Sequence, residues 1–497
     1  MHKGYFRYLL HHYRAASIFF LVSSLIVAIA MNSGHLDENP EYSAPLYSSS
    51  MMYSFVLTLV LTFILPVLLF SFVQKRNSSD LFLPLPVSRK QMLVTTEFYA
   101  FILLSLMSVL AFVTGWILTG MMVSFTKILL LILAGMFFLA MMLLVNTAFF
   151  LTANSTFDGI VMMLAYTVLP LVLAGALQAC GDAAIAGYSS LNSISAGNAI
   201  YVSPFAMSFG SIHAIVNRIT GNIGIFRFDI RPAYCILCGV YGVLAWLALE
   251  RSFVKRQSER AGRISDNVMA YPFIIHAYFF LCTLMIFSSD TDRLLMVLLL
   301  LIVYLAACFV YQRSFRFTKN MIILCASFIL ASFLLVQLGM HTRGFGMADR
   351  YSVGGKGGVR YEYYSFQLDS YNGSGDITFT ASLSPEDMQK HPEVVEILEK
   401  QRHAMIDEFY ESDVSLNDLS RLQGTLYVTN YEDNKDRVDD VSAGSPGVTQ
   451  FAYHTAKGIS MQDLMEIDKV VTVKITGING FQYDLDDYVK DHPEILN

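Results

Sequence analysis

Charge is scarce in this chain of 497 residues, and its scarcity excludes an ordinary soluble protein. Asp, Glu, Lys and Arg make up 15% of the residues, against about a quarter in soluble domains. Each charge at the centre of a membrane helix costs about 2.5–3.5 kcal/mol of insertion free energy. Long apolar runs without an interior charge therefore predict about nine transmembrane helices, near residues 16–34, 52–73, 98–123, 128–152, 159–180, 233–249, 271–289, 294–312 and 320–340.

Sequence motifs of catalysis and of metal or nucleotide binding are lacking as well. The chain has no HExxH, no GxSxG and no GxxxxGK[ST] motif, and its eleven histidines are scattered. The glycine-rich GGKGG at 354–358 lacks the phosphate-loop spacing and is interpreted as a linker. Cysteines are confined to the apolar runs and their flanks, so the C-terminal part uses no disulfides. We therefore expect a non-catalytic membrane protein with no bound cofactor or metal and no nucleic-acid partner.

The charges that are present differ in sign along the chain. Residues 342–497 hold 14 Lys and Arg and 27 Asp and Glu, whereas residues 1–341 hold 20 and 13. Ser384 followed by Asp387 forms a capping box, and the runs GTLYVTN and KVVTVKITG resemble strands. The pattern predicts a membrane part, of which 256–341 contributes three spans, and an acidic soluble α+β domain over 342–497.

The basic residues of the short loops predict the orientation in the membrane. With the N-terminus inside, the inner segments hold fifteen Lys and Arg and the outer loops hold five. Cytoplasmic loops are generally the richer in Lys and Arg. We therefore expect a multi-pass protein of the cell membrane, with a cytoplasmic N-terminus and an extracytoplasmic C-terminal domain.

Two segments outside the spans have unusual composition. The opening MHKGYFRYLLHHYR mixes aromatic, apolar and basic residues, as interfacial helices do, although an unstructured basic tail is the alternative. The stretch 181–230 is too polar to span a membrane and too apolar for a solvated loop. Short helices that re-enter the outer leaflet fit its composition, because irregular backbone is tolerated where protein shelters it.

The loop SSDLFLPLPVSRKQML, residues 78–93, holds the most specific local pattern. Ser88 followed by Gln91 forms a capping box, and Val87 with Met92 forms a hydrophobic staple. Two prolines just before disfavour helix in the residues that precede them. A helix is therefore predicted to begin at Ser88.

Two features of this loop need a partner to explain them. Arg89 and Lys90 lie in the first helical turn, where the helix dipole disfavours cations, so either membrane orientation or an acidic partner surface explains their position. Apolar side chains at Leu81, Phe82, Leu83 and Leu85 would be exposed unless something covers them. A partner contact is one interpretation, and burial in the membrane surface is the other.

Together, these features resemble the membrane subunits of ABC-2 type ATP-binding-cassette transporters, most closely Gram-positive drug or peptide exporters. LPLPVSRKQML is similar to that family's Leu-Pro-Val-Ser-Arg stretch after the second span, and the N-terminal segment and outer loop fit over residues 1–255. The resemblance implies a permease that couples ATP hydrolysis to export of a drug, peptide or lipid-like substrate. ATP and magnesium would bind a separate ATPase subunit, and a second, identical or paralogous permease would complete the pore. The expected partner-coupling residues are Leu81, Phe82, Leu83, Pro84, Leu85, Pro86, Val87, Ser88, Arg89, Lys90 and Met92.

Another class of function stays open from sequence. A membrane receptor could bind a ligand with its outer domain and signal inward, but it would more naturally have a cytosolic effector module, and none is found in the sequence. A proton-driven carrier is less favoured, because no carboxylate lies within the predicted spans.

Overall fold

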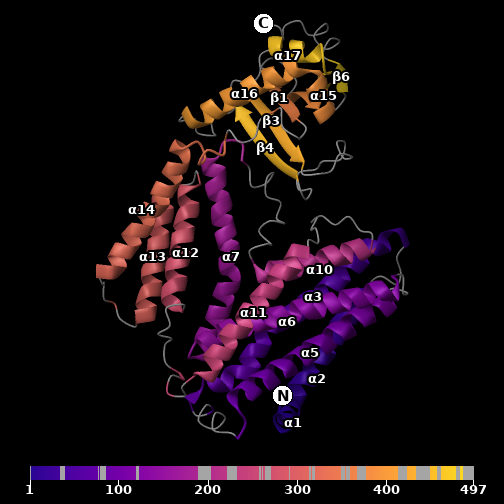
Figure 1. Ribbon diagram of the computed structural model, residues 1–497, viewed down its shortest axis with the longest axis vertical. Coiled ribbons are helices and arrows are strands. Elements are labelled where there is room, and N and C mark those ends of the chain that lie inside the picture. Colours follow the sequence, from indigo (N-terminus) through magenta and orange to yellow (C-terminus); the bar gives the residue numbers. More distant parts are fainter. Residues whose placement is uncertain are drawn as a thin grey trace, which may run out of the picture. The chain divides into compact units, whose positions relative to one another are not determined.

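Helices make up the membrane part of the protein, and the described strands follow later in the chain (Figure 1). The computed structural model describes residues 2–33, 40–76, 78, 86–118, 123–188, 203–220, 232–256, 259, 261–262, 270–289, 292–312, 315, 319–348, 353, 359–366, 376–411, 422–431, 448–455, 461–476 and 482–484. By compactness the chain divides into two units. The first is Met1–Ala174, Ala196–Tyr278 and Ala306–Ser314, and the second is Gly175–Ser195, Phe279–Leu305 and Phe315–Asn497.

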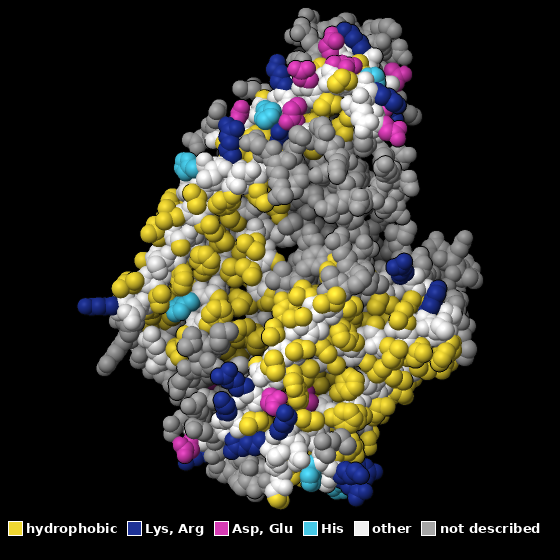
Figure 2. Space-filling model, in the orientation of Figure 1, with side chains coloured by type: hydrophobic (Ala, Val, Ile, Leu, Met, Phe, Trp, Pro, Cys, Tyr) yellow, Lys and Arg dark blue, Asp and Glu magenta, His cyan; other side chains and the backbone are white. Residues whose placement is uncertain are grey.

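Seven described helices are long and apolar enough to cross a membrane, so the chain is a multi-pass helical membrane protein. On the face drawn in Figure 2, apolar side chains cover much of these helices. Such exposure suits contact with lipid rather than water. The seven are the end of α3 (Pro40–Phe70) with the 3₁₀ turn η1 (Ser71–Val73), α5 (Arg89–Leu118), α6 (Phe125–Thr152), α7 (Thr156–Ala184), α11 (Pro232–Val254), α13 (Arg293–Gln312) and α14 (Lys319–His341).

Among the described residues, fewer than the nine predicted spans have a helix long and apolar enough to cross a membrane. All nine apolar runs form helices, but α1 (Lys3–His12) and α2 (Arg14–Ser33) meet at 66° and add at most one span. Helix α12 (Tyr271–Phe287) has 17 residues. At 1.5 Å per residue it covers about 25 Å, less than the bilayer core of about 30 Å.

The N-terminal helix α1 is amphipathic, as predicted, and the alternative of an unstructured tail is wrong. Tyr5 and Leu9 are buried against the first unit, while Lys3 is exposed. The Nδ1 atom of His2 accepts the Tyr5 N–H at 3.2 Å, and the backbone N–H of His2 donates to the Thr95 hydroxyl at 3.1 Å. These bonds attach the start of α1 to the first turns of α5.

The core of the first unit is a bundle of α2, α3, α5, α6, α10 (Pro204–Thr220) and α11. In the stretch 181–230, α7 continues to Ala184, and α10 packs against α3, α6 and α11. Residues 189–202 and 221–231 lie outside the described residues, so re-entry into a leaflet stays a prediction. Glycines on α11 allow α6 to approach it closely, because a Cβ at Gly242 would overlap the sulfur of Met141.

Strands and helices share one core in the second unit. The sheet has the order β4-β3-β1-β2-β5-β6, with antiparallel neighbours throughout. The core includes Leu398 and Met405 of α16, Leu426 of β3 and Tyr453 of β4. The strands are β1 (Val359–Phe366), β2 (Asp376–Leu383), β3 (Leu422–Tyr431), β4 (Val448–Thr455), β5 (Lys474–Thr476) and β6 (Gln482–Asp484), with helices α15 (Pro385–Lys390), α16 (Pro392–Glu411) and α17 (Met461–Asp468).

In the C-terminal part, the predicted helix start is confirmed, whereas the predicted strands are only partly correct. The Ser384–Asp387 capping box forms as predicted, with both reciprocal bonds present. The helix that follows is broken at His391, because Pro392 disfavours helical geometry in the residue before it. The strand GTLYVTN lies within β3, whereas only three residues of KVVTVKITG form β5.

Within the second unit, the end of α7 and the residues that follow α7 and α14 contact α16. The Tyr410 hydroxyl donates to the Ala184 carbonyl at 2.9 Å and accepts the Ala186 N–H at 3.0 Å. The guanidinium of Arg402 is buried, pairs with Glu399 at 2.6 Å and donates to the Ala348 carbonyl at 3.2 Å. These bonds hold the described C-terminal elements against two membrane helices.

We expect Gly242→Ala to lower the thermal unfolding midpoint of the detergent-solubilised protein. The added methyl overlaps Met141, and overpacking of this kind costs about 1–3 kcal/mol. Gly239→Ala on the same helix is the matched control, because its Cβ would lie 3.9 Å from Phe137, an ordinary contact. Adding Met141→Ala should restore much of the loss. An equal midpoint for both alanine variants would contradict the close approach of α6 and α11.

Candidate functional site

The predicted coupling residues fall into two groups. Leu81, Phe82, Leu83, Pro84 and Leu85 lie outside the described residues, so the fate of their apolar side chains stays a prediction. The described group begins where the chain enters α5, and its members differ in burial: Met92 is buried, Val87 and Arg89 are half-buried, and Pro86, Ser88 and Lys90 are exposed.

Helix α5 begins as the capping pattern predicted. The Ser88 hydroxyl accepts the N–H of Gln91 at 3.3 Å, and the Ser88 carbonyl accepts the N–H of Met92 at 2.9 Å. Val87 packs against the buried cluster that contains Met92, as a hydrophobic staple requires. The direction in which the chain enters α5 is therefore fixed by residues 87–92.

The cations of the first turn bind the far end of α11. Arg89 Nη1 donates to the carbonyls of Val254 and Arg256 at 3.0 and 2.6 Å. Lys90 Nζ pairs with Glu250 at 2.6 Å. The dipole of α5 disfavours these cations, but the C-terminal carbonyls of α11 attract them. Acceptors within the chain thus explain the position of these cations. Neither the membrane orientation nor an external acidic surface is needed to explain it.

Arg256, two residues after α11, binds the end of α6 in the same way. Arg256 is 9% exposed and donates from its two terminal nitrogens to the carbonyls of Leu151 and Ala153, each at 2.8 Å. The side-chain amide of Gln74 donates to the Phe150 carbonyl at 2.9 Å. Burial lowers the pKa of Arg256 to about 10, so the guanidinium stays charged at neutral pH. We call Gln74, Arg89, Lys90, Glu250 and Arg256 the arginine joint.

Helix α7 reaches this joint at a glycine. A Cβ at Gly159 would lie 2.7 Å from Cδ2 of Phe150 and 2.9 Å from Nε2 of Gln74. Any side chain there would therefore press on the amide that binds α6. The ends of α3, α6 and α11 and the starts of α5 and α7 thus meet at one place in the first unit.

A buried carboxylate lies within α5, which the sequence analysis did not expect. The predicted span began at residue 98, whereas the helix begins at Arg89 and includes Glu97, which is 5% exposed. Neither oxygen of Glu97 has a hydrogen-bond partner among the described residues. The Thr147 hydroxyl of α6 is within reach but donates to the Leu143 carbonyl at 2.8 Å. The predicted span over 98–123 still holds no charge, but the helix that contains most of it adds a buried carboxylate, which weakens one argument against a proton-driven carrier.

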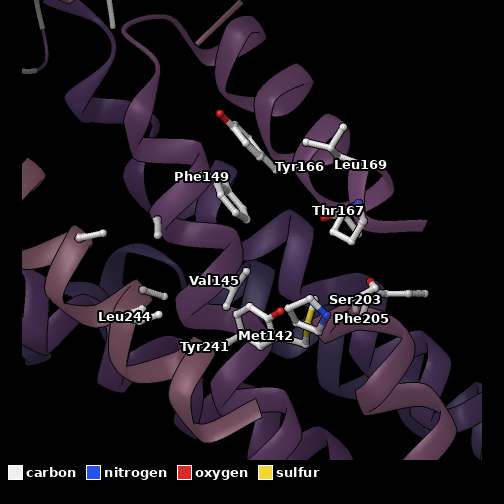
Figure 3. Close-up of a pocket in the computed structure, with 15 residues that line it drawn as sticks. Met142, Val145, Phe149, Tyr166, Thr167, Leu169, Ser203, Phe205, Tyr241 and Leu244 are labelled. Atoms are coloured by element: carbon white, nitrogen blue, oxygen red, sulfur yellow. The ribbon is translucent and has the colours of Figure 1, made fainter. Parts of the chain in front are cut away.

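An apolar pocket of about 310 Å³ lies between α6, α7, α10 and α11 (Figure 3). Phe149 and Tyr166 stack with ring centres 4.4 Å apart on one side, while Met142 and Tyr241 lie on the opposite side. None of the described lining residues is charged. No motif in the sequence indicates this pocket, because its walls come from four helices that are distant along the chain.

Comparison of the chain with family models, curated proteins and solved structures finds no match. The joint and the pocket are therefore interpreted from their own geometry. The joint connects the predicted coupling loop to three other helices, and the pocket offers a partly open apolar volume.

Replacing Arg89 should destabilise the protein more than replacing Lys90. Arg89→Ala removes two bonds from a charged donor, and hydrogen bonds of that kind contribute about 1.5–3 kcal/mol each before discounting for solvent. Lys90→Ala removes an exposed ion pair worth below about 1 kcal/mol. Thermal unfolding in detergent at low and high salt separates the two. Equal midpoints for both variants would contradict the role of Arg89 in holding α11.

Proposed function

We propose that this chain is the permease subunit of an ATP-binding-cassette exporter. The observation that supports this most strongly is the arginine joint, because the first residue of α5 binds the end of α11 directly after the proline-rich loop. A subunit that docks on that loop would act on several membrane helices at once. ATP and magnesium would bind that separate subunit, and this chain would supply the path for the substrate.

The joint gives a physical route for such a displacement. Movement of residues 78–88 shifts Arg89, which is bonded to the backbone at Val254 and Arg256. Arg256 is in turn bonded to the end of α6, where Gln74 also binds. Close-packed interiors transmit small shifts between rigid helices rather than absorbing them. Docking at the loop would therefore move α5, α6 and α11 together.

The proposal includes an orientation. The arginine joint lies in the cytoplasm, as the excess of Lys and Arg in the inner segments requires. The N-terminus is then cytoplasmic, and residues 342–497 form an extracytoplasmic soluble α+β domain. A second permease, identical or paralogous, completes the exporter in the cell membrane. The site where the ATPase subunit docks is formed by the apolar residues of the loop, with Leu83 and Leu85 at its centre.

Two kinds of variant should separate docking from transmission. Leu83→Asp with Leu85→Asp places charge on the docking surface and should abolish recovery of the ATPase subunit in an affinity pull-down from detergent-solubilised membranes. Arg89→Ala leaves that surface intact, so we expect recovery to persist while substrate-stimulated ATP hydrolysis falls severalfold. The partner is identified by peptides of its phosphate-binding loop, and ATPase activity is measured in the purified complex.

Lys90→Ala is the matched comparison: its ion pair is exposed and weak, so its loss should lower hydrolysis much less than Arg89→Ala does. Normal stimulated hydrolysis in both Arg89→Ala and the double aspartate variant would overturn the coupling role of this region. Absence of any ATPase subunit with the wild-type chain would instead favour a receptor whose outer domain binds a ligand.

A further inference from the structure

The pocket between α6, α7, α10 and α11 has the composition of a site for an uncharged ligand. Its described lining is almost entirely apolar and aromatic, with no Asp, Glu, Lys or Arg among the residues that the structure describes. Transfer of an ionised group into such surroundings is very costly unless a partner charge is present. A charged drug or a peptide with free termini is therefore excluded from this pocket.

One wall of the pocket faces the membrane. Leu244 lines the pocket and is 58% exposed, and its neighbours Val243 and Leu247 on α11 are similarly exposed. In a membrane helix, exposed side chains of this kind contact lipid. The pocket is thus accessible from the bilayer, where uncharged apolar compounds concentrate.

The hydroxyl groups in the lining offer little to a polar ligand. Ser203, at the start of α10, is fully buried, and its hydroxyl accepts the N–H of Ala206 at 3.4 Å. Thr167 donates to the Met163 carbonyl at 2.8 Å. Figure 3 shows Ser203 beside Met142 and Phe205, opposite the stacked rings. The described lining therefore favours a ligand held by apolar and aromatic contacts.

The volume limits the size of the ligand. The pocket of 310 Å³ is near the lower end of small-molecule sites, which span about 300–1,000 Å³. It corresponds to roughly ten water volumes of about 30 Å³ each, which leaves room for about ten to fifteen non-hydrogen atoms. A whole phospholipid does not fit, but a compact hydrophobic compound does.

We propose that this pocket binds uncharged, membrane-soluble molecules of that size, and that they are the substrates of the exporter. The assignment as a substrate depends on the proposed function, whereas binding itself does not. The ligand enters from the bilayer past Leu244 and packs between the stacked rings and Met142.

Photolabelling of the full chain in phosphatidylcholine nanodiscs tests the binding. The probe is the neutral label adamantane diazirine, and mass spectrometry maps the labelled residues. We expect saturable labelling of pocket residues that 1-adamantanol competes away and adamantane-1-carboxylate does not. Ala248→Phe fills the pocket from an exposed position and should reduce this labelling about tenfold, equivalent to about 1.4 kcal/mol. Leu247→Phe, on the same helix outside the pocket, should leave it unchanged.

Labelling that rises linearly with probe, or that Ala248→Phe does not reduce, would overturn the proposal. The assay needs no ATPase subunit. Loss of saturable labelling therefore counts against the pocket alone, and a failed pull-down with intact labelling counts against the exporter alone.

Discussion

The arrangement of the first unit depends on guanidinium groups that bind helix C-terminal carbonyls. The last carbonyls of an α-helix have no partner within the helix and have partial negative charge. Arg89 supplies donors to the end of α11, and Arg256 supplies them to the end of α6. Arg89 belongs to α5, and Arg256 follows α11. The bonds of Arg89 therefore fix α5 against α11, and the bonds of Arg256 fix α11 against α6.

The chemistry of arginine suits this role better than that of lysine. A planar guanidinium presents several donors at fixed angles, so Arg256 reaches two carbonyls with two nitrogens while buried. Lys90 makes one exposed contact to Glu250, which solvent and salt weaken. The rigidity of the joint therefore comes from the two arginines. The glycine at 159 completes it, since a side chain there would displace Gln74.

Signals that are local in sequence were predicted well, and contacts between distant residues were not. The start of α5 at Ser88 and the capping box at Ser384 depend on side chains three residues apart, which a single sequence displays. The acceptors of Arg89 lie more than 160 residues away, and no periodicity indicates them. Glu97 was missed because the apolar run begins one residue later, although the helix starts earlier. The pocket requires the packing of four helices, which composition alone does not specify.

Helices α6 and α11 contribute residues to both the joint and the pocket. These two helices therefore connect the pocket to the loop before α5. On α11, Ala248 lines the pocket and Val254 accepts from Arg89, six residues or about 9 Å along the axis. On α6, Ala148 lines the pocket and Leu151 accepts from Arg256, less than one turn away. A helix does not bend easily over one or two turns, because its hydrogen bonds are cooperative. In the proposed exporter, a small shift at the joint would therefore reach the pocket wall with little loss and would change the shape that this wall offers to a ligand.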